Sequence, residues 1–317
     1  MIDIIIPAFN AHDTIERAIA SVIAQTAIDQ IKITIVDDCS SVGYAACIDK
    51  FKHLVPIREI RLTVNGGPGV ARQAGIDITE QKYIAFLDAD DVLYTAASIA
   101  KLLTVMEEEP KIYMVSSYFY EELPNGSFLS HENDTTWVFG KVYRREYLDR
   151  HQIRFNTTRA NEDLGFNTKV RSRATQKDMI YFLYEPTYLW RHKPESITRT
   201  NFGAYANRDG FLGFIQNKKE ALAHPKAVTE FVADDGIKTI ISCYFMFCDV
   251  LQEASKNKEA SLAALRDFWK AIGRDIYRGS PQWIVADAFN EVARKWGRQR
   301  SIPSITMSEF INMMEEG

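Results

Sequence analysis

Three carboxylates directly follow a short apolar stretch in the first third of the chain. Residues 83–87 read YIAFL, and Asp88, Asp90 and Asp91 come within the next four positions. Such a bounded apolar run is typical of a buried strand, and open α/β sheets bind ligands at the carboxyl ends of their strands. Negative charges this close together favour a bound cation, and Mg²⁺ is often held by one or two carboxylates plus a substrate's phosphates. The stretch predicts a divalent-cation site, although an isolated Asp-x-Asp is more often the start of a helix.

Small and acidic residues also follow two other expected strands. Residues 7–10 (PAFN) come after a strand expected at residues 2–6, and Asp37 and Asp38 end one that begins at Ile31. The carboxyl ends of parallel strands lie along one edge of a sheet, so we expect these segments to meet at one crevice.

A glycine-rich loop at residues 65–69 (NGGPG) precedes an expected helix that carries Arg72. Backbone amides, the helix dipole and a guanidinium group all favour anions, so a pyrophosphate or nucleotide is expected near this loop. The loop is not a dinucleotide fingerprint, because Arg72 stands where the third glycine of Gly-x-Gly-x-x-Gly would be. The chain contains no Walker A sequence either.

Composition bounds the class of protein that carries these residues. The 317 residues are 46% hydrophobic and 25% charged, which suits a globular chain with a substantial core. A formal net charge of −4 argues against a general binder of nucleic acid or anionic membranes. The four cysteines lack Cys-x-x-Cys spacing and are expected to be reduced thiols. The chain begins on an expected strand, not a signal peptide, and no apolar segment suffices to span a bilayer. We therefore expect a cytoplasmic protein, with peripheral membrane contact left open.

The pattern of elements predicts how these segments are held. Strands and helices alternate four times before residue 110, which predicts a mainly parallel sheet flanked by helices. After residue 110 the order of expected elements becomes a mixed α+β one, with a helix expected at 161–173. From about residue 203 the sequence predicts helices. Capping boxes are expected at residues 13–16 and 306–309, where an acidic residue follows an N-cap by three positions.

Taken in order, these segments resemble those of the family-2 glycosyltransferases of the GT-A fold. The likeness covers about residues 1–200, and motifs in a family's order are far more specific than any single motif. The matching segments are residues 4–10, 21–25, 35–40, 65–75, 86–91, 140–144, 153–155, 161–164 and 196–198.

The resemblance implies an α/β fold with a Rossmann-like, mixed but mainly parallel sheet flanked by helices. It implies a nucleotide-sugar-binding half at residues 1–110 and an acceptor-binding, catalytic half of the same GT-A domain at residues 111–200. Residues 201–317 lie outside the likeness and are expected to form a C-terminal helical region.

The resemblance also implies a nucleotide-diphosphate sugar as donor, usually a UDP-sugar. Asp38 would accept a hydrogen bond from the base, Arg72 would contact the base or a phosphate, and Asp88 would hold the ribose. The alternatives are a helix-capping turn residue for Asp38 and an exposed helix position for Arg72. The substrate-binding residues that it implies are Pro7, Ala8, Asn10, Asp38, Gly67, Arg72, Asp88, Ala89, Glu162 and Arg191.

Catalysis, by the same resemblance, is inverting and uses Asp163 as the general base that takes the proton from the acceptor hydroxyl. Glu162 competes for that role, and an acidic pair that merely complements a helix dipole is the alternative for both. Asp90 would bind a divalent metal, Mn²⁺ or Mg²⁺, and His192 is a second candidate ligand. Asp91 is equally a candidate for a helix N-cap.

The expected acceptor is a glycan, as in polysaccharide biosynthesis. A protein side chain, a lipid carrier and a hydroxylated nucleic-acid base are open alternatives, and a basic cluster at residues 294–300 keeps nucleic-acid or membrane contact open. A processive synthase is disfavoured because its Gln-x-x-Arg-Trp signature is absent. Two other functions are open: a metal-dependent nucleotidyltransferase, and a non-catalytic nucleotide- or glycan-binding module.

Overall fold

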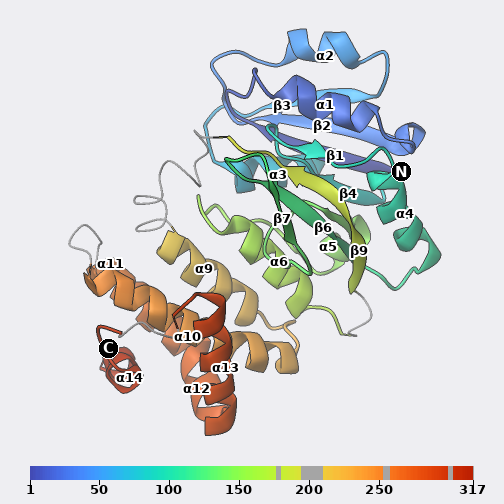
Figure 1. The fold of residues 1–317 in the computed structure, drawn as a ribbon. Coiled ribbons are helices and arrows are strands. Elements are labelled where there is room, and N and C mark those ends of the chain that lie inside the picture. The colour runs from blue at the N-terminus through green and yellow to red at the C-terminus, as the bar shows by residue number, and fades with distance from the viewer. Residues whose placement is uncertain (176–179, 194–209, 253–257, 299–302, 317) are drawn as a thin grey trace. The chain divides into compact units, whose positions relative to one another are not determined.

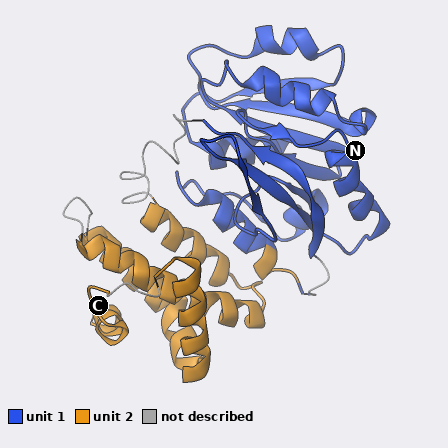
Figure 2. Cartoon of the chain, viewed as in Figure 1, with its two compact units in different colours: residues 1–170, 175–195 blue, residues 171–174, 196–317 orange. Residues whose placement is uncertain are grey.

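The computed structural model describes residues 1–175, 180–193, 210–252, 258–298 and 303–316. The chain forms two compact units, residues 1–170 with 175–195 and residues 171–174 with 196–317 (Figure 2). The family-like segment at 196–198 and residues 299 and 300 of the basic cluster lie outside the described residues.

A nine-stranded mixed sheet is the framework of the first unit (Figure 1). Strand β1 pairs in parallel with β2 and β4, and β2 pairs in parallel with β3, which forms the expected parallel half. Strand β8 is inserted antiparallel between β4 and β6, so the sheet continues in mixed directions as β8-β6-β9-β5, with β7 on β6. The strands are β1 (Ile2–Ala8), β2 (Ile31–Asp37), β3 (Ile57–Arg61), β4 (Tyr83–Phe86), β5 (Val92–Leu93), β6 (Met114–Glu122), β7 (Phe128–His131), β8 (Lys141–Arg144) and β9 (Ile180–Trp190).

Helices cover both faces of this sheet, as the burial of nearly every residue of β1 and β4 requires. Successive strand side chains point to opposite faces, so Ile4 packs in one core cluster with residues of α1, α2 and α4. Ile5 belongs to a second cluster with residues of α3, α5 and α6. These helices are α1 (Ile15–Ile23), α2 (Ala45–Phe51), α3 (Pro68–Ile78), α4 (Ser98–Glu108), α5 (Arg145–Arg150) and α6 (Glu162–Ser172), with a 3₁₀ turn η1 (Ile28–Gln30) before β2. The expectation of a mainly parallel sheet flanked by helices is confirmed.

One of the two expected capping boxes is wrong. Helix α1 has Thr14 at its N-cap with no side-chain cap, because the amides of Thr14 and Ile15 instead donate to the carbonyl oxygen of Ala11 at 3.1 and 3.0 Å. The other box is confirmed: Thr306 Oγ1 accepts from the amide of Glu309, whose side chain accepts in return from the amide of Thr306.

The second unit is helical in the part that the structure describes. Its longest helix, α10, buries Ile241, Tyr244 and Phe247, and the ring of Phe310 from the last helix lies 5.6 Å from Tyr244 and 6.1 Å from Phe247. None of the described helices combines the length and apolar character needed to cross a bilayer. The elements are α9 (Phe211–Leu222), α10 (Thr229–Gln252), α11 (Lys258–Phe268), the π-helical turn η4 (Trp269–Gly273), α12 (Arg274–Gly279), α13 (Gln282–Lys295) and α14 (Met307–Glu315).

Candidate active site

Arg72 is the centre of a buried group of charges in the first unit. Its Nη1 lies 2.6 Å from Asp163 Oδ1 and 3.1 Å from Glu162 Oε1, and its Nη2 lies 2.7 Å from Asp88 Oδ1. Arg72, Glu162 and Asp163 are only 3%, 6% and 5% exposed. Helix α3, the end of β4 and the start of α6 are thus joined by one guanidinium group. The structure brings together four of the residues that the sequence placed in a site.

Close approach of α3 and α6 makes this group possible. Gly69 lies in the first turn of α3, and a Cβ atom there would come within 3.0 Å of both the Glu162 side chain and the carbonyl oxygen of Asn156. Any larger residue would therefore push the start of α6 away from Arg72. Glu162 and Asp163 lie in the first turn of α6, where negative charge also complements the helix dipole.

The three carboxylates outnumber the cation that they share. Burial is the largest influence on Asp163 and raises its pKa to about 8; the charges of Glu162 and Asp88 add to this rise and Arg72 opposes it. Burial also raises the pKa of Glu162. One guanidinium group cannot compensate two buried carboxylates and a third, half-buried one, so we infer that the Glu162–Asp163 pair retains a proton near neutral pH. A carboxyl group with a pKa near the working pH is suited to general acid–base chemistry.

Asp38 binds the glycine-rich loop. Its two carboxylate oxygens accept hydrogen bonds from the amides of Gly66 and Gly67, each at 2.8 Å, and its own amide donates to the carbonyl oxygen of Ala8. Gly67 has φ of +88°, a conformation that favours glycine, and it is the N-cap of α3. These two amides, where we expected a phosphate, therefore bind a carboxylate of the protein itself.

The ends of β1 and β2 are joined beside Asp38. Asn10 follows β1 with φ of +49°, which asparagine tolerates better than most residues, and its amide donates to Ser40 Oγ at 2.9 Å. Asn10 Oδ1 accepts from the amide of Ser41 at 2.9 Å. Pro7 and Ala8, the last residues of β1, are therefore on the same edge of the sheet as Asn10.

Asp91 fixes the end of β9. Tyr188 donates its hydroxyl hydrogen to Asp91 Oδ2 at 2.6 Å, and the amide of Arg191 donates to Asp91 Oδ1 at 2.8 Å. The Tyr188 hydroxyl also accepts from the amide of Asp88 at 3.2 Å. Asp91 is 1% exposed and precedes strand β5, so it holds two strands together and caps no helix. Sequence reasoning missed Tyr188, which nothing in the sequence distinguishes from Tyr181 and Tyr184 of the same strand.

Asp90 is half-buried beside two cations that sequence reasoning also missed. Arg17 donates through Nη2 to the backbone oxygen of Asp90 at 2.7 Å. Burial raises the pKa of Asp90, the charge of Asp88 adds to the rise, and Lys193 and Arg17 oppose it. Arg17 on α1 and Lys193 after β9 thus place positive charge around this carboxylate.

A metal ion in this region would take most of its coordinating oxygen atoms from a bound substrate and from water, not from the protein. No group of three or more histidine, cysteine or acidic side chains in the described ranges could hold an ion. The backbone amide of His192 donates to Glu122 Oε2, which also lies 3.1 Å from Arg191 Nε. Mg²⁺ commonly binds one or two carboxylates and completes its shell with waters and phosphate oxygens. Asp90 fits an ion of that kind, and Mn²⁺ and Mg²⁺ both take such oxygen ligands.

A buried lysine lies beside the segment that covers Asp163. The amide of Val138 faces Asp163 Oδ2 at 3.4 Å. Lys141 Nζ lies 3.6 Å from Asp134 Oδ1 and makes no hydrogen bond, and burial lowers its pKa. Asp134 Oδ1 accepts from the amides of Thr136 and Trp137, so this carboxylate shapes the turn before Val138.

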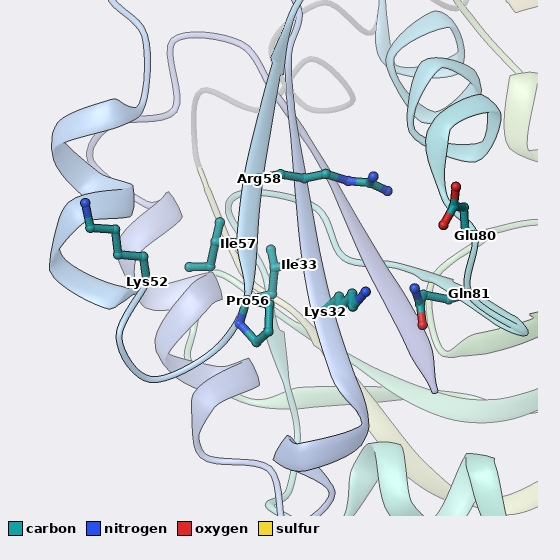
Figure 3. Close-up of a pocket in the computed structure, with 8 residues that line it drawn as sticks. All are labelled: Lys32, Ile33, Lys52, Pro56, Ile57, Arg58, Glu80 and Gln81. Atoms are coloured by element: carbon teal, nitrogen blue, oxygen red, sulfur yellow. The ribbon is translucent and has the colours of Figure 1, made fainter.

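A hollow of about 340 Å³ lies at the opposite edge of the sheet (Figure 3). It is formed at the start of β2 and β3 and by the turn before β4, which are the amino ends of parallel strands. Parallel sheets bind ligands at their carboxyl ends, so the charged group around Arg72, not this hollow, is the candidate active site. The hollow is lined by Lys32, Ile33, Lys52, Pro56, Ile57, Arg58, Glu80 and Gln81.

A known protein family matches the part of the chain that contains most of the candidate site. The family model described as "Glycosyl transferase family 2" matches residues 3–165, about half of the chain. The matched range contains Arg72, Asp88, Asp90, Glu162 and Asp163, and it ends before Arg191 and His192.

Individual relatives are more distant. The chain is 28% identical over 223 residues to an uncharacterized glycosyltransferase, EpsJ, of Bacillus subtilis (strain 168), which is 62% of this chain and 63% of that protein. It is 25% identical over 204 residues to the poly(ribitol-phosphate) beta-N-acetylglucosaminyltransferase TarP of Staphylococcus aureus (strain N315), covering 57% of this chain and 62% of that protein. The chain therefore spans less than two thirds of the length of these relatives.

A solved structure shares the fold. The crystal structure of S. aureus TarS in complex with UDP-GlcNAc superposes with a TM-score of 0.72, covering 96% of this chain and 94% of that chain at 17% sequence identity. The GT-A architecture expected from the sequence is thereby confirmed.

Proposed function

Because the chain belongs to glycosyl transferase family 2, we propose that it transfers a sugar from a nucleotide-diphosphate donor to an acceptor hydroxyl group. The observation that carries this proposal is the buried cluster in which Arg72 joins Asp88 at the end of β4 to Asp163 at the start of α6. The cluster lies at the carboxyl ends of the parallel strands, where open α/β sheets bind nucleotides. It also contains a carboxyl group whose pKa of about 8 suits proton transfer.

The proposed donor is a UDP-sugar. Support comes from TarS, which shares this fold and was crystallised with UDP-GlcNAc, and from TarP, whose name describes an N-acetylglucosaminyltransferase. We assign the nucleotide to the edge formed by Pro7, Ala8, Asn10 and Asp38, with the ribose at Asp88. Gly67, Ala89 and Arg191 would complete the walls of this site.

The donor's diphosphate is assigned to the region of Asp90. A divalent ion bound by Asp90, with His192 as a second candidate ligand, would supply charge stabilisation to the departing nucleotide diphosphate. Arg17 and Lys193 place further positive charge beside Asp90. Both side chains can therefore stabilise negative charge that develops on the leaving group.

We assign the general base to Asp163. As the acceptor oxygen attacks the anomeric carbon, its proton passes to a carboxylate oxygen of Asp163, and the bond between that carbon and the diphosphate oxygen breaks. Attack from the side opposite the leaving group inverts the anomeric configuration. A positioned general base typically contributes ~10²–10⁴-fold to the rate. Glu162 lies next to it and shares Arg72, so its charge tunes Asp163.

The proposed acceptor is a glycan or a related polyhydroxylated polymer. This rests on the relatives, since TarP is named for a poly(ribitol-phosphate) acceptor. The assignment of the acceptor to the segment around Val138 follows from the position of that segment against Asp163.

A screen of nucleotide sugars with Mn²⁺ tests the proposal. Each donor is scored by the shift in melting temperature and by release of nucleoside diphosphate, because a ligand that binds only the folded chain stabilises it by mass action. We expect a UDP-sugar to raise the melting temperature in a metal-dependent way and to be hydrolysed slowly. Release of pyrophosphate from a nucleoside triphosphate would indicate a nucleotidyltransferase instead, and binding without turnover at any pH would indicate a binding module.

A further inference from the structure

Both terminal nitrogens of Arg72 already donate to carboxylates of the protein, whereas its buried Nε has no hydrogen-bond partner among the described residues. Its Nη1 serves both Glu162 and Asp163, and its Nη2 serves Asp88. The side chain is 4% exposed and lies 6.0 Å from the ring of Phe155. A guanidinium group held in this way has little capacity left for a phosphate or a base.

We propose that Arg72 is a positioning residue that favours the ionised form of Asp163 and orients its carboxylate, and that its second contact links this carboxylate to Asp88 in the donor site. The inference rests on the proposed function, in which Asp163 accepts the acceptor's proton and Asp88 contacts the donor. It replaces the expectation that Arg72 itself contacts the base or a phosphate.

The balance of charge supports this assignment. The charged and titratable groups that face Asp163 come from α3, β4, α6 and β8, and they are Arg72, Asp88, Glu162, Lys141 and Tyr143. Among these groups Arg72 lies within hydrogen-bonding distance of Asp163, and it is the largest influence that lowers the pKa of Asp163 against the effect of burial. Lys141 is buried without a hydrogen bond, and burial lowers its own pKa, so it is a weak counter-ion.

The geometry also distinguishes the two oxygens of Asp163. Oδ1 is bound by Arg72 at 2.6 Å, whereas Oδ2 faces the amide of Val138 at the longer distance of 3.4 Å. Oδ2 therefore keeps more capacity to accept a proton. Arg72 fixes the carboxylate so that this oxygen, not Oδ1, is presented to the acceptor.

Donor binding would act on the same cluster through Asp88. In the structure Asp88 forms an ion pair with Arg72, which weakens the attraction of Arg72 for Asp163. When Asp88 turns to a donor hydroxyl group, its ion pair with Arg72 weakens. The attraction between Arg72 and Asp163 then becomes stronger, which favours the ionised form of Asp163. Binding of the donor would thus promote ionisation of Asp163, the form that accepts a proton.

The experiment compares pH–rate profiles of the wild-type chain, Arg72→Met and Arg72→Lys with a donor identified by the screen above. In the wild type kcat should rise with pH as Asp163 ionises, which gives the pH–rate profile a rising limb. Loss of a nearby opposite charge raises a carboxyl pKa by about one to three units, so in Arg72→Met this limb should shift to a pH higher by about one to three units. We expect kcat of Arg72→Met to fall about tenfold or more at pH 7 and to recover partly above pH 9. Arg72→Lys keeps the charge and should bring the limb back towards the wild-type position. The KM for the donor should change less than about threefold, since the proposal places no donor contact on Arg72.

Arg58→Met is the matched control. Arg58 is also an arginine paired to a buried carboxylate, with Nη2 3.0 Å from Asp3, but it lies at the opposite edge of the sheet (Figure 3). Its loss should reduce stability without moving the pH–rate profile.

Two results would overturn the inference. One is a rising limb at the same pH in folded Arg72→Met and in the wild type; if Arg72→Met does not fold, Arg72→Gln takes its place, because glutamine also removes the charge but keeps hydrogen-bond donors. The other is a donor KM raised about tenfold with kcat unchanged, which would make Arg72 a donor ligand. Failure of the proposed function is separate, because it would appear as undiminished turnover in Asp163→Asn.

Discussion

Replacing Asp163 with asparagine should remove activity and yet stabilise the protein at alkaline pH. The carboxyl group is buried beside Glu162 and Asp88, and its pKa is raised from 3.8 to about 8. Asparagine has nearly the same shape and cannot ionise. It therefore removes the unfavourable buried charge while its side-chain oxygen can still accept a hydrogen bond from Arg72.

The size of the effect follows from the pKa. Below about pH 4 the carboxyl group is neutral in the folded and unfolded chains alike, so its contribution to stability is fully present. As the pH rises, the unfolded chain ionises first, and this contribution is lost by the time the pH passes about 8. One pKa unit corresponds to about 1.4 kcal/mol, so the rise from 3.8 to about 8 corresponds to a full loss of up to about 6 kcal/mol, part of it shared with Glu162.

Urea unfolding followed by tryptophan fluorescence at pH 5 and pH 9 measures this difference. We expect Asp163→Asn to be more stable than the wild type by less than about 2 kcal/mol at pH 5 and by up to about 6 kcal/mol at pH 9. Asp3→Asn is the matched control. Asp3 is equally buried, but its Oδ2 accepts hydrogen bonds from Thr34 and Arg58 at 2.9 and 3.0 Å. That substitution should destabilise the protein by about 1–3 kcal/mol.

The outcome that would refute this reasoning is a variant less stable than the wild type at pH 9. It would mean that the ion pair of Asp163 with Arg72 outweighs burial and repulsion, and that Asp163 is ionised throughout. A difference that is the same at pH 5 and pH 9 would also contradict it, because the effect would then have no connection with titration.

Three further substitutions probe the surroundings of the cluster. Tyr188→Phe leaves the buried Asp91 carboxylate without its 2.6 Å hydrogen bond and should lower the free energy of unfolding by about 2–3 kcal/mol; an unchanged urea midpoint would contradict this. Lys141→Met removes a buried amine that has no hydrogen bond and lies 3.6 Å from Asp134. It should leave stability unchanged or raise it by about 1–2 kcal/mol, and a loss above about 3 kcal/mol would show that the ion pair is needed. Asp90→Asn should abolish the Mn²⁺-dependent part of the donor's effect on the melting temperature, and an undiminished metal effect would remove Asp90 from the proposed metal site.

The parallel half of the fold was predictable because its signals are local. The run at residues 2–6, apolar except for Asp3, and the apolar run at residues 83–87 both indicate buried strands. The antiparallel insertion of β8 between β4 and β6 was not predictable in this way. It pairs Tyr83 with Arg144 and Met114 with Tyr143, and no pattern within one segment specifies partners so far apart in the chain.

The candidate site shows the same limit at the level of single residues. An arginine after a glycine-rich loop was expected to meet an anion, and it does, but the anions are Asp88, Glu162 and Asp163 of the chain itself. The acidic residues were recognisable from their segments. Their pairing with Arg72 depends on how α3 and α6 pack, which the absence of a side chain at Gly69 permits.

The most direct test of the account is turnover of the identified donor by Asp163→Asn at saturating donor and Mn²⁺. The account predicts that release of nucleoside diphosphate falls ~10²–10⁴-fold while the donor still raises the melting temperature as it does for the wild type. Release at the wild-type rate would show that Asp163 is not the base, and the assignment of the Arg72 cluster as the active site would be contradicted.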